Sequence, residues 1–110
     1  MPPWWFPIVR NFEIRADRAA FGLPLTLTNQ WRSIAKNLFE HGSPTSQHLV
    51  GLARDFAGPR WAEDQLMANA RRLGLIAIDE RKRAGYRPHI HIQAYPAGSI
   101  PVTVFAQIAR

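Results

Sequence analysis

The period of the hydrophobic pattern changes at Gly74, and this change constrains the fold more than any other feature of the sequence. Over 60–73, apolar residues recur every three or four positions, which is the spacing of one helix face. Over 75–79 and again over 90–95, they alternate or are β-branched, which is typical of strands. A glycine readily ends a helix, so the sequence predicts a helix that leads into a two-stranded hairpin.

The sequence before this helix predicts two further helices and a short strand. Apolar residues repeat at helical spacing over 29–41 and over 44–57, and Pro59 follows the second of these segments. The segment 8–15 alternates as a half-buried strand does. The apolar, β-branched tail over 100–108 predicts either one more strand or an oligomer contact.

Charge and cysteine content narrow the class of function. The net charge of +6 and the pI near 11.1 favour a polyanionic partner, of which nucleic acid is the commonest, although a purely solubilising charge is the alternative. The absence of cysteine excludes disulfides and thiolate zinc sites. No segment approaches the roughly 20 apolar residues of a membrane helix, so we expect a cytoplasmic, nucleoid-associated protein.

Two helices joined by a tight turn and followed by a hairpin are the parts of a winged helix-turn-helix. The order Leu52-Ala53, then Arg72-Leu73-Gly74-Leu75-Ile76, then Gly85-Tyr86 resembles winged helix-turn-helix DNA-binding proteins of bacteria, phages and plasmids. The resemblance implies an α+β fold in one domain over 1–110. This domain would have an N-terminal arm (1–27), a winged-helix core (28–95) and a C-terminal strand or oligomer contact (96–110).

The resemblance also implies a function and a set of contacts. The protein would bind double-stranded DNA, as a small transcriptional regulator or as a replication or partition accessory that acts by occupying its site. Residues of the third helix would read base edges, and basic residues of the wing would neutralise phosphates. A solvated charged face is the alternative for each of them. The candidate DNA-binding residues are Arg60, Gln65, Arg71, Arg72, Arg81, Lys82, Arg83, Tyr86 and Arg87.

Two other classes of function stay open beside a DNA-binding homodimer. The first is a winged-helix protein-interaction module or a phage-type inhibitor of a host complex. The second is a metal-dependent enzyme that uses His89 and His91, which lie on one face of a strand. Two ligands do not make a site, and His41 and His48 have no acid at a recognisable ligand spacing. Without a further catalytic pattern, the sequence predicts no enzyme, no metal and no cofactor.

Overall fold

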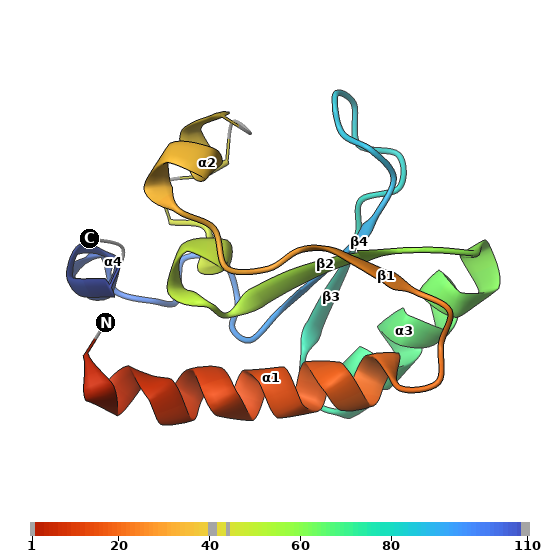
Figure 1. Cartoon of the computed structure of the whole chain (residues 1–110), viewed down its shortest axis with the longest axis horizontal. Coiled ribbons are helices and arrows are strands. Elements are labelled where there is room, and N and C mark those ends of the chain that lie inside the picture. Colours follow the sequence, from red (N-terminus) through yellow and green to blue (C-terminus); the bar gives the residue numbers. More distant parts are fainter. Residues whose placement is uncertain (1, 40–41, 44, 109–110) are drawn as a thin grey trace.

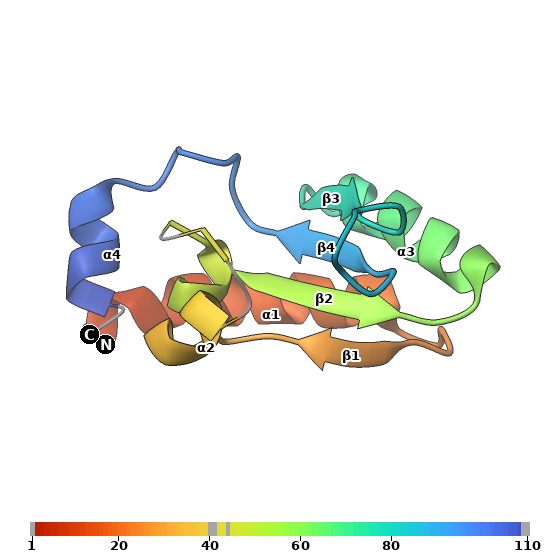
Figure 2. The ribbon, with the colours of Figure 1, turned by 90° about the horizontal axis from the view of Figure 1, so that it is seen from above.

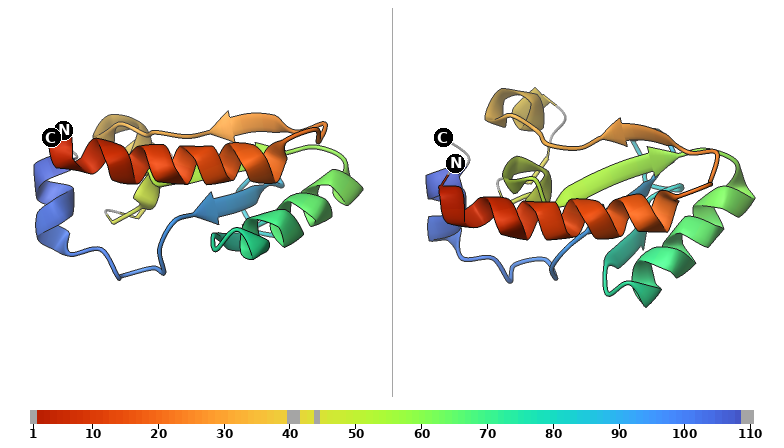
Figure 3. Two further views of the ribbon diagram at one scale, coloured as in Figure 1. Left: turned by 90° about the horizontal axis from the view of Figure 1, so that it is seen from below. Right: turned by 60° about the horizontal axis from the view of Figure 1, so that its bottom comes forward.

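Two helices lie along one side of an antiparallel sheet in the computed structural model, which describes residues 2–39, 42–43 and 45–108 (Figure 1). The sheet has four strands in the order β1-β2-β4-β3. Both long helices, α1 and α3, lie on the same side of it, whereas α4 lies beyond one end (Figures 2 and 3). The elements, in chain order, are η1 (Pro3–Trp5), α1 (Phe6–Ala20), β1 (Thr26–Asn29), α2 (Ile34–Phe39), η2 (Gln47–Val50), β2 (Ala53–Ala57), α3 (Arg60–Arg72), β3 (Ile76–Asp79), β4 (Ile90–Gln93) and α4 (Val102–Ile108).

The alternation of side chains in β2 and β4 separates a core face, packed against α1 and α3, from the opposite face of the sheet. On the core side, Ile90 and Ile92 are fully buried, and Arg54 donates to Asp17 and Glu13 of α1. Successive side chains of a strand point to opposite faces, so the neighbours of Arg54 and of Ile92 face away from the helices. The register pairs Asp55 with His91, which places these two residues together on the face opposite the two long helices.

The core is built from α1, α3, η2 and the sheet. Burying each of its large apolar side chains contributes roughly 1.5–3 kcal/mol, which is why this side of the sheet is covered by helices. The largest fully buried side chains are Phe12, Val50, Leu52, Leu66, Ile90 and Ile92.

The expected α+β class is confirmed, and so are several of its elements. The helix over 60–73 is α3, and the hairpin strands are β3 and β4. The helix expected over 29–41 is present but shorter, as α2, and residues 40–41 lie outside the described part of the chain. No helix in that part is both long and apolar enough to cross a membrane.

The helix expected over 44–57 is the most consequential error. Pro44 is outside the described residues, and the rest of the segment forms η2 and then the central strand β2. The chain turns between them at Gly51, whose φ of 75° is a left-handed conformation that favours glycine. A helix-turn-helix core over 28–95 therefore lacks its second helix.

Two predictions of strands are also wrong. The segment 8–15 lies within α1, because Val9, Phe12, Ala16 and Ala19 form one buried helix face that outweighs the short alternation. In the tail over 100–108, residues Val102–Ile108 form α4 instead of a strand, and Phe105 is buried in the core, whereas the alternative of an oligomer contact stays a prediction.

Candidate metal centre

Three side chains that are far apart in the sequence meet on the face of the sheet opposite α1 and α3. They are His48 from η2, Asp55 from β2 and His91 from β4, and their potential ligand atoms all lie within 4.8 Å of one another. The antiparallel register brings Asp55 opposite His91, and the turn at Gly51 returns η2 over the end of β2. The structure describes one such group of histidines and acids among residues 2–39, 42–43 and 45–108.

His48 is held with one nitrogen directed toward this group. Its Nδ1 lies 2.8 Å from the carbonyl oxygen of Gln30. A carbonyl can only accept, so Nδ1 is the donor in this contact, and in the neutral imidazole Nε2 is the nitrogen with the lone pair. That Nε2 is buried, has no hydrogen-bond partner in the described part of the chain, and lies 3.3 Å from Oδ2 of Asp55. A buried lone pair facing a carboxylate is a position that a cation would stabilise.

His91 is oriented in the same way by an amide. Gln93 donates from Nε2 to the carbonyl oxygen of Tyr95 at 2.7 Å, which turns its Oε1 toward His91. The Nε2 of His91, 2.7 Å from that Oε1, must then carry the proton and donate it. Its Nδ1 faces Oδ1 of Asp55 at 2.9 Å.

The electrostatics of the group follow from these contacts. Burial alone would raise the pKa of Asp55, but the adjacent imidazoles of His48 and His91 hold this pKa well below its usual range. Burial alone would lower the pKa of His91, but the carboxylate of Asp55 raises it above its ordinary value. Without a metal ion, the site therefore favours a proton between Asp55 and His91.

The donor set fits a divalent metal ion, and zinc in particular. Two imidazole nitrogens and one carboxylate oxygen are the protein ligands of many catalytic zinc sites, which leave a fourth position open for water or substrate. The outer nitrogen of each imidazole is bonded to an oxygen, at Gln30 and at Gln93, as zinc-binding histidines almost always are. The residues present therefore supply both the metal ligands of such a site and the hydrogen-bond partners that orient its histidines.

A second carboxylate and a third histidine lie beside this group. Glu80 Oε2 is 2.7 Å from Nε2 of His89 and 3.1 Å from a guanidinium nitrogen of Arg83. The Nδ1 of His89 lies 2.7 Å from the carbonyl oxygen of Arg87, and its Nε2 is 3.9 Å from Oδ1 of Asp55. Glu80 and His89 thus form a polar pair at the edge of the candidate metal centre.

Six of the nine residues considered for DNA contacts make contacts within the protein. Arg81 forms ion pairs with three acidic side chains, Asp79 at 2.8 Å, Asp64 at 2.9 Å and Glu63 at 3.6 Å. Arg83 pairs with Glu80 and lies over the ring of Tyr86. On α3, Arg71 donates to the carbonyl oxygen of Ala77, and both Gln65 and Arg72 donate to Asn69. Arg60, Lys82 and Arg87 are exposed.

Sequence reasoning missed two of the three candidate ligands. It considered His91 only with His89, although the neighbour that completes the group is Asp55. The available signal was the spacing of His48 and Asp55 on either side of Gly51, since a left-handed glycine lets the chain fold back within seven residues.

Comparison with known proteins identifies the family. The family model for Peptidase M15 matches residues 9–93, a range that contains all three candidate ligands. No curated protein and no solved structure matches the chain. The match overturns the winged helix-turn-helix resemblance, together with double-stranded DNA as the partner, transcription or replication as the function, and the expectation of no enzyme. It gives no support to the interaction-module alternative.

The resemblance failed for a physical reason. A helix end, a glycine and a buried strand, as in 72–76, recur wherever a helix precedes a strand, and here they join α3 to β3 of an antiparallel sheet. The family match spans most of the sequence, including most of α1, which the winged-helix interpretation left outside its core. The chain belongs to the Peptidase M15 family.

Proposed function

We propose that the protein is a zinc-dependent peptidase whose metal ion is held by His48, Asp55 and His91. The observation that carries this proposal is the convergence of two histidine nitrogens and one carboxylate, each histidine bonded to an oxygen through its outer nitrogen. Membership of the Peptidase M15 family supports the reaction class. We also propose that residues 1–110 act as one domain, because α1, the sheet, α3 and Phe105 of α4 contribute to one core.

In the proposed hydrolysis, the zinc ion and the side chains of the protein have different roles. When bound, zinc supplies a Lewis acid that polarises the scissile carbonyl and lowers the pKa of water. Gln30 and Gln93 fix the directions of His48 and His91, so that both lone pairs point to one position. Asp55 supplies the negative charge that such a site needs to retain a divalent cation.

Glu80 is the carboxylate that we assign to proton transfer. It is only slightly exposed, and His89 and Arg83 hold one of its oxygens, which limits its rotation. In hydrolysis, Glu80 would take a proton from the attacking water and deliver it to the departing amine as the peptide bond breaks. His89, between Glu80 and Asp55, is a positioning residue in this scheme.

We propose peptides of the peptidoglycan type as the substrate class. The chain carries a net charge of +6, which favours association with an acidic polymer, and the metal centre lies on the face of the sheet opposite α1 and α3 (Figure 1).

The test is hydrolysis of purified peptidoglycan and of its soluble stem peptides, followed by chromatography of the released amines. The protein loaded with zinc should cleave, a chelator should stop cleavage, and added zinc should restore it. His48→Ala and His91→Ala should be inactive, whereas Gln65→Ala, at an exposed position of α3, should match the wild type. Cleavage that survives chelation, or equal activity in His48→Ala, would contradict the proposal.

A further inference from the structure

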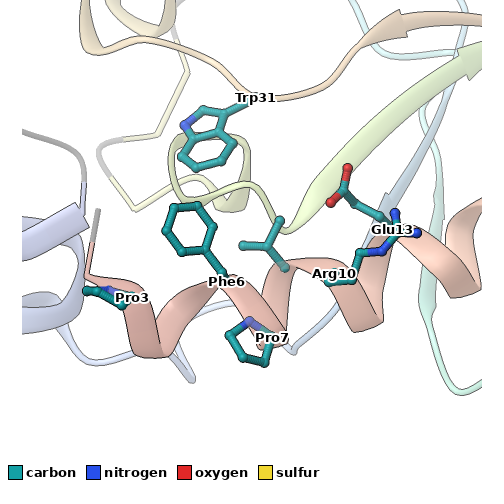
Figure 4. Close-up of a pocket in the computed structure, with 7 residues that line it drawn as sticks. Pro3, Phe6, Pro7, Arg10, Glu13 and Trp31 are labelled. Carbon is teal, nitrogen blue, oxygen red and sulfur yellow. The ribbon is translucent and has the colours of Figure 1, made fainter.

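A groove separates the N-terminal half of α1 from the segment that follows β1 (Figure 4). Its volume is about 580 Å³, which is within the range of small-molecule sites. Phe6 projects from α1 and Trp31 projects from the opposite wall, and the two rings approach one another across the groove. Both remain accessible, with 55% of Phe6 and 47% of Trp31 exposed. The groove therefore presents aromatic surface to solvent.

The ring of Trp31 is supported from behind. A Cβ placed on Gly51 would lie 3.1 Å from Cε3 of Trp31 and 3.4 Å from a methyl group of Val9, so the indole packs directly on the glycine backbone. A ring that is already fixed loses little conformational entropy when a ligand stacks on it.

The polar groups at the rim supply both a donor and an acceptor. Arg10 is exposed on α1 and makes no ion pair or hydrogen bond within the described residues. Glu13, one turn further along α1, receives a hydrogen bond from Arg54 at 3.3 Å and keeps further acceptor capacity. Together with Arg54 and its second partner, Asp17, these groups carry no net charge, so the rim suits a neutral ligand that carries hydroxyl or amide groups rather than a phosphate.

The groove is connected to the candidate metal centre through the residues on either side of Trp31. The carbonyl oxygen of Gln30 accepts from Nδ1 of His48, and the amide of Arg32 donates to the carbonyl oxygen of His48 at 2.8 Å. One three-residue segment thus contacts the metal-binding histidine on one side and forms a wall of the groove on the other.

We propose that this groove binds a saccharide ring of a glycan that carries the peptide substrate. A saccharide combines an apolar C–H face, which stacks on Trp31 and Phe6, with hydroxyl and amide groups that bond to Arg10 and Glu13. This inference rests on the proposed function, because it assigns a second contact to the substrate of the same enzyme. The peptide would be cut at the metal centre while its glycan lies across the segment at Trp31.

The experiment measures binding of an N-acetylglucosamine tetrasaccharide, which has no peptide to cleave, to the full chain by calorimetry. Phe6→Ala and Arg10→Ala should each weaken the affinity by roughly tenfold, since each removes one of the proposed contacts. Matched controls are Phe21→Ala and Arg18→Ala, which change exposed residues of the same types at or beyond the far end of α1. Both controls should bind the tetrasaccharide as the wild type does.

The outcomes separate this inference from the proposed function. No binding by the wild type, or equal binding by Phe6→Ala and Phe21→Ala, would overturn the saccharide groove even if peptide cleavage is observed. Binding of a proline-rich peptide in place of the tetrasaccharide would overturn it in favour of a protein ligand. Saccharide binding that persists in His48→Ala, together with loss in Phe6→Ala, would uphold the groove whatever the fate of the peptidase assay.

Discussion

The Oδ1 atom of Asp55 lies 2.9 Å from Nδ1 of His91, and the two residues are direct partners in the register of β2 and β4. This pair is the rigid part of the candidate metal centre, because both residues stand on adjacent central strands of the sheet. His48 joins them from η2, whose position depends on the turn at Gly51 and on the bond to Gln30.

The stability of the metal-free protein should depend on pH through this pair. The lowered pKa of Asp55 contributes stability above its ordinary value of 3.8, and this contribution is lost as the pH falls through the pKa of the folded state. The raised pKa of His91 contributes stability below its ordinary value of 6.5, and this contribution is lost as the pH rises through the folded pKa. Thermal unfolding without metal should therefore show the largest contribution from the pair between about pH 4 and pH 6.5.

Asp55→Asn is the control for this pH profile, since it removes the charge and keeps the shape of the side chain. Its unfolding temperature should vary less than that of the wild type on both sides of the window. If the wild type and Asp55→Asn show the same dependence of unfolding temperature on pH, Asp55 and His91 do not control this dependence.

Gln93→Ala should weaken zinc binding by roughly 10- to 100-fold, because the amide fixes the ring of His91 and accepts its outer proton. Competition with a chromogenic chelator measures this affinity. Gln93→Glu, which can still accept a hydrogen bond from His91, should keep most of the zinc affinity. An unchanged affinity in Gln93→Ala would mean that His91 is oriented by other contacts.

Glu80→Gln should reduce the rate of peptide hydrolysis by about 100-fold or more while the zinc content stays the same, because it removes the proton acceptor and leaves the three ligands in place. Steady-state kinetics and metal analysis of one preparation check both parts. Asp64→Asn is the matched control, since this exposed acid pairs with Arg81. Full activity in Glu80→Gln would assign proton transfer to another group.

Gly51→Ala should destabilise the fold by more than the roughly 1–2 kcal/mol expected for a left-handed alanine alone. Gly51 has a φ of 75°, and a Cβ there would press on the ring of Trp31. Gly98→Ala is the comparison, because Gly98 has a φ of 78° with nothing within 4 Å of its Cβ position. Denaturant unfolding of both variants gives the difference, and equal losses would show that Trp31 adjusts without cost.

Local periodicity was sufficient to predict part of this fold. The helix at α3 and the hairpin strands β3 and β4 follow from the change of period at Gly74, which holds regardless of the surrounding structure. The same reasoning misassigned β2. Leu49, Leu52 and Phe56 recur at helical spacing, but β2 is a central strand with neighbours on both edges, and tertiary pairing outweighs local spacing.

The candidate site was harder to predict from the sequence than the fold. The alternation in β4 placed His89 and His91 on one strand face, but the nearest ligand to His91 comes from Asp55 of another strand. The strand order β2-β4-β3 makes Asp55 the neighbour of His91. A prediction that treats β2 as part of a helix cannot include this pairing. His48 was likewise expected within a helix, where it could not face Asp55 across the turn at Gly51.

The measurement that tests the central claim most directly is the zinc stoichiometry of the purified chain, by metal analysis after dialysis against trace zinc. The wild type should hold one zinc ion per chain, and His48→Ala, Asp55→Ala and His91→Ala should each lose most of it. His89→Ala should retain it, because His89 contacts Glu80 and is not one of the three ligands. A wild type that binds no zinc, or triad variants that retain a full equivalent, would contradict the assignment of His48, Asp55 and His91 as the metal centre.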